Sequence, residues 1–277
     1  MKTIFKFLIR KILGFRGINK IYFGKNSGFK FRYDDNLNID MMLGIHEPNT
    51  FEVFDLFVKE GMVVCDIGAN IGYFSRFLSS KVGINGRVFL FEPIPQTFER
   101  LKETVELNKL SNNLTLVEAA ISNANGNLDI FLSKTHYMSS LDRSWAGQEC
   151  GKIEVKGIVL DDYFEEQGFY PDFIKMDIEG GGVYALEGMK KCIKKAEPVL
   201  LLESHSPAED LAIGNAVSLI PYNVYRVGSS VEVKNLNRDY TDKFGIYDTI
   251  VAIPKSKEKL YGKWNPSIFQ NKRLGQR

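Results

Sequence analysis

The sequence predicts a doubly wound α/β fold, in which one mostly parallel sheet carries helices on both faces. Short apolar runs alternate with longer segments of helical periodicity after about residue 50. The apolar runs lack polar alternation, which is typical of parallel strands covered on both faces. The repeated order of strand, helix and strand indicates right-handed crossovers within a single sheet.

The elements of this sheet can be placed in order along the chain. Apolar runs predict main strands at 62–67, 87–92, 114–119, 173–178 and 198–204. Periodic segments between them predict helices at 72–81, 95–109 and 183–195. Residues 121–162, between the third and fourth of these strands, are richer in turns and short strands. Two last runs, at 222–227 and 247–254, have no clear helix between them and are predicted to pair antiparallel.

Composition limits the class of protein. The chain has 277 residues, of which 44% are hydrophobic and 25% charged, so it can bury one substantial core. Its three cysteines form neither a Cys-x-x-Cys pair nor an even set, which argues against a disulfide framework and favours a reducing, cytoplasmic environment. A net charge of +2 is too small to indicate a nucleic-acid partner. No apolar run is long enough to span a membrane.

The ends of the chain differ from its middle. Residues 1–16, "MKTIFKFLIRKILGFR", interleave basic and apolar side chains at helical spacing. Such a helix either packs on the body of the protein or lies peripherally on an anionic inner membrane surface. A cleaved signal is disfavoured because charges interrupt every apolar stretch. We predict an N-terminal segment 1–50, a main α/β domain 51–254 and a solvated, basic tail 255–277.

A glycine-containing turn follows the first main strand. Asp66, Gly68, Asn70 and Gly72 stand in the stretch "DIGANIG", where the carboxyl end of a strand meets the next helix. Ligands of open α/β sheets bind at this edge. Neither the G-x-G-x-x-G dinucleotide pattern nor a P-loop is present. An acid just before the turn suits a cationic group such as an amino-acid ammonium, which S-adenosylmethionine carries.

A second acid lies at the tip of the next strand. Glu92 closes the run "FLFEPIP", and Pro93 stops the strand from continuing. A carboxylate fixed there can accept hydrogen bonds from both hydroxyls of a ribose. Together, the two acids and the glycines predict a site for S-adenosylmethionine.

These residues resemble the FkbM family of S-adenosylmethionine-dependent methyltransferases. The resemblance extends from about Glu47 to Glu203 and rests on "CDIGANIGYFS", "FEPIPQTFERLKETVELN", "VEAAISNANG", "SSLD", "LDDYF" and "IKMDIEG". It implies a Rossmann-like class I methyltransferase fold with a seven-stranded sheet. It also implies O-methylation of a hydroxyl on a sugar, a polysaccharide precursor or a natural product.

The resemblance also implies roles for individual residues. The turn residues named above would line the methionine end of the cofactor, and Glu92 would hold the ribose. Glu118, Ala119 and Ala120 would border the adenine of the cofactor, and Ser140 would approach the cofactor as methyl donor. One departure follows "DIEG": the family typically has one variable residue and then a second acid, where this chain has Gly181 and Gly182. The missing acid either weakens activity or reflects drift at a helix start.

Methyl transfer to an alcohol needs an aligned acceptor and a base within hydrogen-bond reach. Asp177 and Glu179 follow the fourth main strand, and Glu203 and His205 follow the fifth, so all four are expected to face one site. We predict Asp177 as the binder or base, and His205 next because an unperturbed imidazole titrates near neutral pH. Glu179 is the third predicted catalytic residue. Lys175 is expected to pair with a neighbouring acid.

Alternatives to this reading remain. Asp177, Glu179 and His205 could form an oxygen-rich metal site, but their spacing matches no established signature, so we predict no metal. The chain could instead bind the cofactor without turnover. A nucleic-acid methyltransferase is disfavoured because "DIEG" stands where such enzymes carry an Asn/Asp-Pro-Pro-aromatic stretch. The predicted partner is a small-molecule or glycan acceptor, and the sequence leaves the oligomeric state open.

Overall fold

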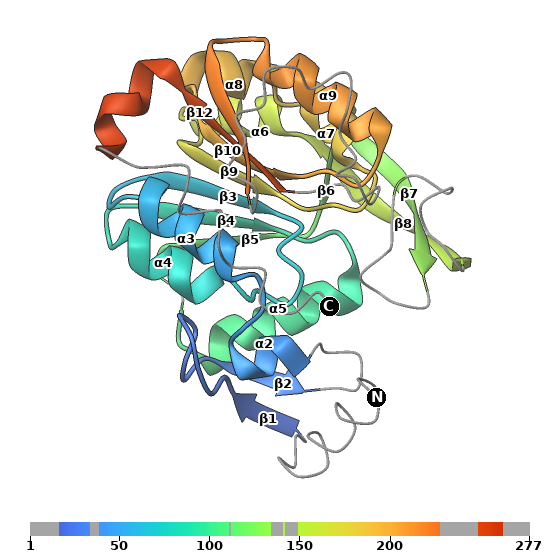
Figure 1. Ribbon diagram of the computed structural model, residues 1–277. Helices are drawn as coiled ribbons and strands as arrows, with labels where there is room; N and C mark the ends of the chain where they lie inside the picture. Colours follow the sequence, from blue (N-terminus) through green and yellow to red (C-terminus); the bar gives the residue numbers. More distant parts are fainter. Residues whose placement is uncertain are drawn as a thin grey trace.

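The computed structural model describes residues 17–33, 39–110, 112–133, 141, 149–227 and 249–262. A seven-stranded sheet of order β11-β12-β10-β9-β3-β4-β5 crosses its centre (Figure 1). Its strands are β3 (Val63–Ile67), β4 (Arg87–Phe91), β5 (Leu114–Val117), β9 (Phe173–Met176), β10 (Val199–Glu203), β11 (Tyr222–Arg226) and β12 (Thr249–Pro254). β12 is antiparallel to β10 and β11, and the other pairs are parallel. The predicted sheet, including its antiparallel C-terminal strand, is confirmed.

Helices cover both faces of this sheet (Figure 1). One layer contains α3 (Pro48–Phe57), α4 (Ser75–Val82) and α5 (Pro95–Leu107). The other contains α6 (Leu160–Gln167), α7 (Gly182–Glu187), α8 (Lys190–Ala196) and α9 (Pro207–Val217). Across the described segments, every helix is too short or too polar to cross a bilayer.

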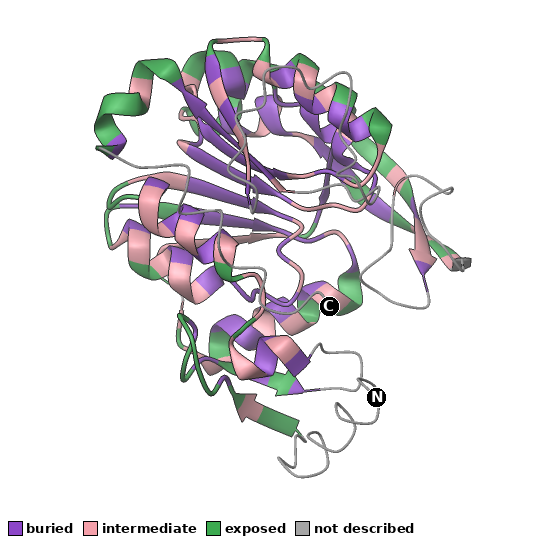
Figure 2. Ribbon diagram, in the orientation of Figure 1, coloured by how far each residue is buried: buried purple, intermediate pink, exposed green. Residues whose placement is uncertain are grey.

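Each face of the sheet has its own apolar core. Neighbouring residues of a strand point to opposite faces, and so Val64 and Val88 join the core under α3, α4 and α5. Cys65 and Phe89, one position further along, join the core under α6, α7, α8 and α9. The strands are therefore buried on both sides, as Figure 2 shows, and this explains their unbroken apolar runs.

Part of the N-terminal segment packs against the same body. β1 (Gly17–Lys20) and β2 (Lys30–Tyr33) form an antiparallel pair, followed by α2 (Ile39–Leu43). The side-chain amide of Asn108, at the end of α5, donates to Lys30 O and accepts from Lys30 N, both at 2.8 Å. Phe29 and Phe31 are fully buried in the core under α3. α3 itself crosses the boundary predicted at residue 50. Residues 1–16 lie outside the described residues, so the amphipathic helix and its membrane contact stay predictions.

The described parts of the insertion and of the tail contain regular structure. β6 (Ala120–Ser122), β7 (Gly126–Ser133) and β8 (Glu149–Val159) form a separate three-stranded sheet, in which β8 has eleven residues. η2 (Lys255–Tyr261) begins the tail that was predicted to be solvated. Tyr261 is buried there, with its ring centroid 5.1 Å from that of Phe57, so this aromatic contact holds the first turns of the tail on α3.

Candidate active site

The candidate site lies where the order of the strands reverses. The chain passes from β3 outward to β4 and β5, and then returns to β9 on the other side of β3. The carboxyl ends of strands at such a switch point are the usual ligand site of an open α/β sheet. All the predicted catalytic side chains and most of the predicted cofactor residues follow these strand ends.

The glycine turn after β3 adopts left-handed backbone conformations. Gly68, Asn70 and Gly72 have φ angles of 81°, 51° and 83°. The N–H groups of Gly68 and Ala69 donate to Phe91 O at 3.0 and 2.9 Å, which fastens the turn to the end of β4. A Cβ atom on Gly68 would lie 2.0 Å from the carbonyl oxygen of Asp177. Only glycine therefore fits at the point where the turn passes the end of β9.

Glu92 is fixed at the tip of β4 by two backbone donors. Asn70 N donates to Glu92 Oε2 at 3.1 Å, and Ile94 N donates to Glu92 Oε1 at 3.0 Å. Burial raises the pKa of Glu92 to about 7, although these two hydrogen bonds favour the ionised form. The carboxylate is held beside the glycine turn, and each of its oxygens keeps a second lone pair for a further donor.

Asp66 and Lys175 form a buried ion pair inside the sheet. The two residues are register partners on β3 and β9, so their side chains leave the same face. Lys175 Nζ lies 3.1 Å from Asp66 Oδ1, and both side chains are almost wholly buried. The pairing predicted for Lys175 is confirmed. The role of Asp66 toward the ammonium group of a ligand stays a prediction. In the structure, the carboxylate of Asp66 is paired with the ammonium group of Lys175.

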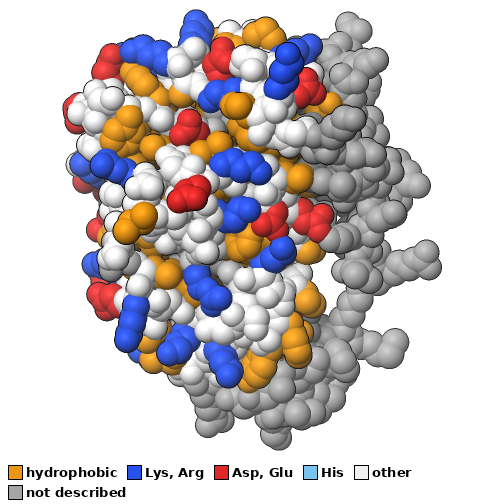
Figure 3. Space-filling view, turned by 90° about the vertical axis from the view of Figure 1, so that its left-hand side faces the viewer, with side chains coloured by type: hydrophobic (Ala, Val, Ile, Leu, Met, Phe, Trp, Pro, Cys, Tyr) orange, Lys and Arg blue, Asp and Glu red, His pale blue; other side chains and the backbone are white. Residues whose placement is uncertain are grey.

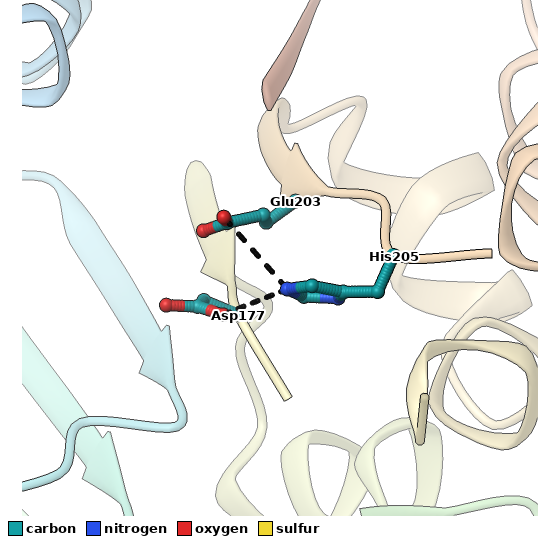
Figure 4. A group of neighbouring side chains, drawn as sticks. All are labelled: Asp177, Glu203 and His205. Atoms are coloured by element: carbon teal, nitrogen blue, oxygen red, sulfur yellow. Dashed lines mark ion pairs between the residues drawn. The ribbon is translucent and has the colours of Figure 1, made fainter. Parts of the chain in front are cut away.

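Four acids from three elements surround the imidazole of His205. His205 Nε2 lies 3.5 Å from Asp177 Oδ1, 3.6 Å from Glu179 Oε2 and 3.7 Å from Glu203 Oε1. Figure 4 shows Asp177 and Glu203 converging on this nitrogen from the ends of β9 and β10. On the other side of the ring, Glu209 Oε2 lies 3.3 Å from His205 Nδ1. The structure therefore brings together the three predicted catalytic residues.

The crowding of acids changes how these groups titrate. Burial alone would lower the pKa of His205, but a hydrogen bond with Glu209 and the charges of the surrounding acids raise it to about 9. The charge of Asp177, together with burial, raises the pKa of Glu203 to about 9. His205 is therefore cationic at neutral pH in this arrangement, so it does not offer the free base that an unperturbed imidazole would.

A fifth acid reaches the site from the segment before α3. Glu47 Oε1 lies 3.0 Å from His46 Nε2, and Thr50 Oγ1 donates to Glu47 Oε2 at 3.0 Å. Burial would raise the pKa of Glu47, but the hydrogen bond with His46, the charges of His46 and Lys175, and the bond from Thr50 lower it to about 2. Glu47 is therefore ionised, and its charge contributes to the raised pKa of Glu203.

Glu209 is a residue of the candidate site that the sequence analysis missed. It stands on the first turn of α9 and is 1% exposed. Its Oε1 accepts from Gly182 N at 3.0 Å, and its Oε2 accepts from His205 N at 2.8 Å. A Cβ on Gly182 would lie 2.8 Å from Oε1. Glu209 thus fills the space that a larger residue at position 182 would enter.

A sequence signal for Glu209 did exist. Ser206 caps α9 by accepting from Glu209 N at 3.2 Å, and Pro207 follows at the first helical position. Ser-Pro-x-Glu is therefore a helix-start pattern, in which the acid at the third helical position turns back toward the residues before the cap.

The residues predicted to border the adenine lie beyond β5. Ala119 and Ala120 are buried, and Glu118 is exposed. Ala120 opens β6, so this stretch connects the main sheet to the smaller one. Ser140 lies outside the described residues, and its predicted role stays a prediction.

Comparison with known proteins agrees with this geometry. A family model described as the methyltransferase FkbM domain matches residues 66–227, which is more than half of the chain. The hexuronic acid methyltransferase AglP of Haloferax volcanii is 26% identical over 187 residues, covering 65% of this chain and 69% of that protein.

Solved structures of methyltransferases match part of the chain at low identity. The methyltransferase FkbM from Methylobacillus flagellatus has 19% identity and a TM-score of 0.47, and the match covers 69% of this chain and 43% of that one. Fibrillarin from Aeropyrum pernix, solved with bound S-adenosyl-L-methionine, has 13% identity and a TM-score of 0.41, with coverage of 72% and 69%. On the extent of the family match, this chain belongs to the FkbM family and is a methyltransferase.

Proposed function

We propose that the chain is an S-adenosylmethionine-dependent O-methyltransferase, whose acceptor is a hydroxyl of a sugar, a polysaccharide precursor or a natural product. The observation that carries the proposal is the position of the Glu92 carboxylate. It is held by the backbone of Asn70 and Ile94 at the same sheet edge as Asp177 and His205. Glu92 would then bind the ribose from the end of β4, and the acids that follow β9 and β10 would receive the acceptor on the other side of β3.

The residues present fit the proposed cofactor. S-adenosylmethionine carries an ammonium and a sulfonium, and a site rich in carboxylates favours such cations. Glu47, Asp177 and Glu179 meet this requirement before α3 and after β9. Glu92 would hold the ribose, and the backbone of Gly68 and Gly72 would lie against the methionine portion.

The cofactor supplies an electrophilic methyl group, and the protein residues position the acceptor and manage its proton. Asp177 is the best candidate to accept the proton, because its carboxylate is 28% exposed at the end of β9. His205 at neutral pH carries its own proton, so it would hold Asp177 and Glu179 in place by ionic attraction. Collinear arrangement of acceptor and donor would supply much of the rate.

The charge of the site favours a neutral acceptor. The relative AglP is named for a hexuronic acid, whose carboxylate is an anion. A free carboxylate approaching Asp177 and Glu179 would meet like charges, whereas a hydroxyl would not. We therefore propose transfer to a hydroxyl, and a matched pair of a neutral hexoside and its hexuronoside would distinguish the two acceptor types.

Calorimetric titration tests the cofactor. S-adenosylmethionine should bind to freshly purified, cofactor-stripped protein, and Glu92→Gln should weaken binding at least about tenfold because a charge-assisted acceptor is lost. Glu165→Gln is the matched control, since Glu165 is an exposed acid paired with Lys191 and Lys195 on the outer helices. No binding to the unmodified protein would refute the proposal.

The alternatives predict different results. A chain that binds without turnover would show cofactor affinity but no release of S-adenosylhomocysteine with any acceptor in a glycan panel. A nucleic-acid methyltransferase would show binding with a steep salt dependence. Basic and acidic side chains are interspersed on the face shown in Figure 3, unlike the continuous basic stripe of a nucleic-acid surface.

A further inference from the structure

Two carboxylates and an imidazole form a mixed set of metal-ligating atoms at the ends of β9 and β10. One ligand atom each from Asp177, Glu203 and His205 lies within 4.8 Å of the others. Figure 4 shows Asp177 and Glu203 converging on one edge of the imidazole from two different strands. A cation bound at about 2.0–2.3 Å from each atom requires separations of this order between its ligands.

The imidazole is oriented as a metal ligand would be. Glu209 Oε2 lies 3.3 Å from His205 Nδ1 and also accepts from His205 N at 2.8 Å. Glu209 is itself anchored, because its Oε1 accepts from Gly182 N at 3.0 Å. A carboxylate on one ring nitrogen places a proton there and turns the other nitrogen toward the metal, which is the common outer arrangement of histidine ligands.

The facing side of the ring presents acceptors rather than donors. Oxygens of Asp177, Glu179 and Glu203 all lie within 3.7 Å of His205 Nε2, and in the absence of a metal the proton of the imidazolium lies between these groups. Lys175 neutralises little of the negative charge of these acids. Its Nζ lies 3.9 Å from Asp177 Oδ2 and is paired with Asp66 at 3.1 Å. A divalent cation would take the place of that proton between the ring and the carboxylates, because metal binding to imidazole and carboxylate ligands releases protons.

We propose that Asp177, Glu203 and His205 bind one divalent cation, with Glu209 as the positioning residue for the imidazole. Two oxygens and one imidazole nitrogen suit a first-row ion such as Mn²⁺ better than Ca²⁺, which prefers oxygen ligands alone. The proposal rests on the proposed function for its purpose: the cation would bind the acceptor oxygen and lower the pKa of its hydroxyl. With Asp177 bound to the cation, the carboxylate of Glu179, which is not a ligand, would accept the released proton in its place. Three protein ligands leave positions open for that oxygen.

Manganese titration of the full chain tests the site without any methyl transfer. Loss of the free Mn²⁺ paramagnetic resonance signal should report one site per chain after treatment with a chelator, in the absence of S-adenosylmethionine. Asp177→Asn and His205→Ala should each weaken Mn²⁺ binding at least about tenfold, and Glu209→Gln should weaken it by roughly 10- to 100-fold. Glu165→Gln should leave the affinity unchanged, and circular dichroism should show that each variant is folded.

The outcomes separate this proposal from the proposed function. Glu92→Gln should lose cofactor affinity and keep Mn²⁺ affinity, since Glu92 is not a ligand of the cation. Absence of Mn²⁺ binding in a protein that binds S-adenosylmethionine would overturn the cation site and leave the methyltransferase proposal standing. Binding that survives His205→Ala, or that is equally tight for Ca²⁺, would also overturn it, because the acids alone would then be responsible.

Discussion

Lys175 on β9 and Asp66 on β3 occupy paired positions in the register of the sheet, and their charged atoms meet at 3.1 Å in its interior. Burial opposes both charges, but their attraction holds the pKa of Lys175 above its ordinary value. The pair lies directly under the glycine turn that begins at Gly68. The candidate site therefore lies next to a buried ion pair within the mostly apolar interior of the sheet.

Removal of one partner of this pair should be costly. Lys175→Met leaves Asp66 as an uncompensated buried charge, so we expect a loss of about 3–5 kcal/mol in the free energy of unfolding. Urea denaturation measures this loss. The double variant Asp66→Asn with Lys175→Met should recover much of the stability, and a single-variant loss below about 1 kcal/mol would contradict the role assigned to the pair.

Glu92 should make the unliganded protein less stable as pH rises. Its pKa is raised to about 7 in the folded state, from an ordinary value near 4.5. Between these values the folded protein binds the proton and the unfolded chain does not, so stability is lost with rising pH across this window. The upper bound of the effect is about 3 kcal/mol. Unfolding free energies should fall less steeply between these pH values for Glu92→Gln, and equal slopes would contradict the assignment.

Cofactor affinity should depend on pH in the opposite direction. Ribose hydroxyls donate to the ionised form of Glu92, so we expect the Kd for S-adenosylmethionine to rise by up to about tenfold for each pH unit below about 7. Calorimetry across this range measures the dependence. Glu92→Gln carries no titrating group at this position and should give a flatter profile.

Gly68 should be far less tolerant of substitution than another glycine of the same backbone conformation. Gly61 has a φ of 82° and open space around its Cα, so Gly61→Ala should cost about 1–2 kcal/mol from backbone strain alone. Gly68→Ala adds a contact of 2.0 Å with Asp177 O and must move the turn or β9. We expect a larger loss in urea denaturation and at least about tenfold weaker cofactor binding. Similar effects of the two substitutions would contradict the close approach.

Gly182 and Glu209 should act together on the rate rather than on cofactor binding. In Gly182→Ala the new methyl group would lie 2.8 Å from Glu209 Oε1, so it should displace the carboxylate that orients His205. We expect kcat to fall at least about tenfold while the Kd for S-adenosylmethionine changes little. Gly181→Ala is the control, because its nearest neighbour is Ile178 O at 3.2 Å and its φ of −80° suits alanine. An unchanged kcat in Gly182→Ala would argue against Glu209 as a positioning residue.

Much of the fold was predictable because both faces of the sheet are covered. The apolar runs located β3, β4, β9 and β10 to within a residue or two. The run at 114–119 was wrong at its end, since Val117 closes β5 and Ala120 begins β6 in another sheet. The pattern of apolar residues indicates which residues are buried, but it does not indicate to which sheet a strand belongs.

Breaks inside elements depend on contacts between distant parts of the chain. The helix predicted at 183–195 is divided into α7 and α8 at Gly188, where a Cβ would lie 2.0 Å from Ser122 O. Ser122 is far away in sequence, so no local pattern reveals this approach. The length of β8 depends in the same way on its pairing with β7.

The site was predictable in its residues and less so in its electrostatics. The strand ends correctly placed Asp177, Glu179 and His205 near one another, because parallel strands end at one edge. The pKa of His205, raised to about 9, depends on how many carboxylates surround one ring, Glu209 included. That number is a property of the packed site and not of any single segment.

Positions 182 and 209 compete for one small volume. The carboxylate that approaches His205 from the start of α9 fits only because nothing projects from the start of α7. An acid introduced at 182 would need a smaller residue at 209, and a smaller residue at 209 would make room for one at 182. The two positions should therefore change together in sequences that evolve from this one. In such a pair of changes, the carboxylate beside His205 would come from α7 instead of α9.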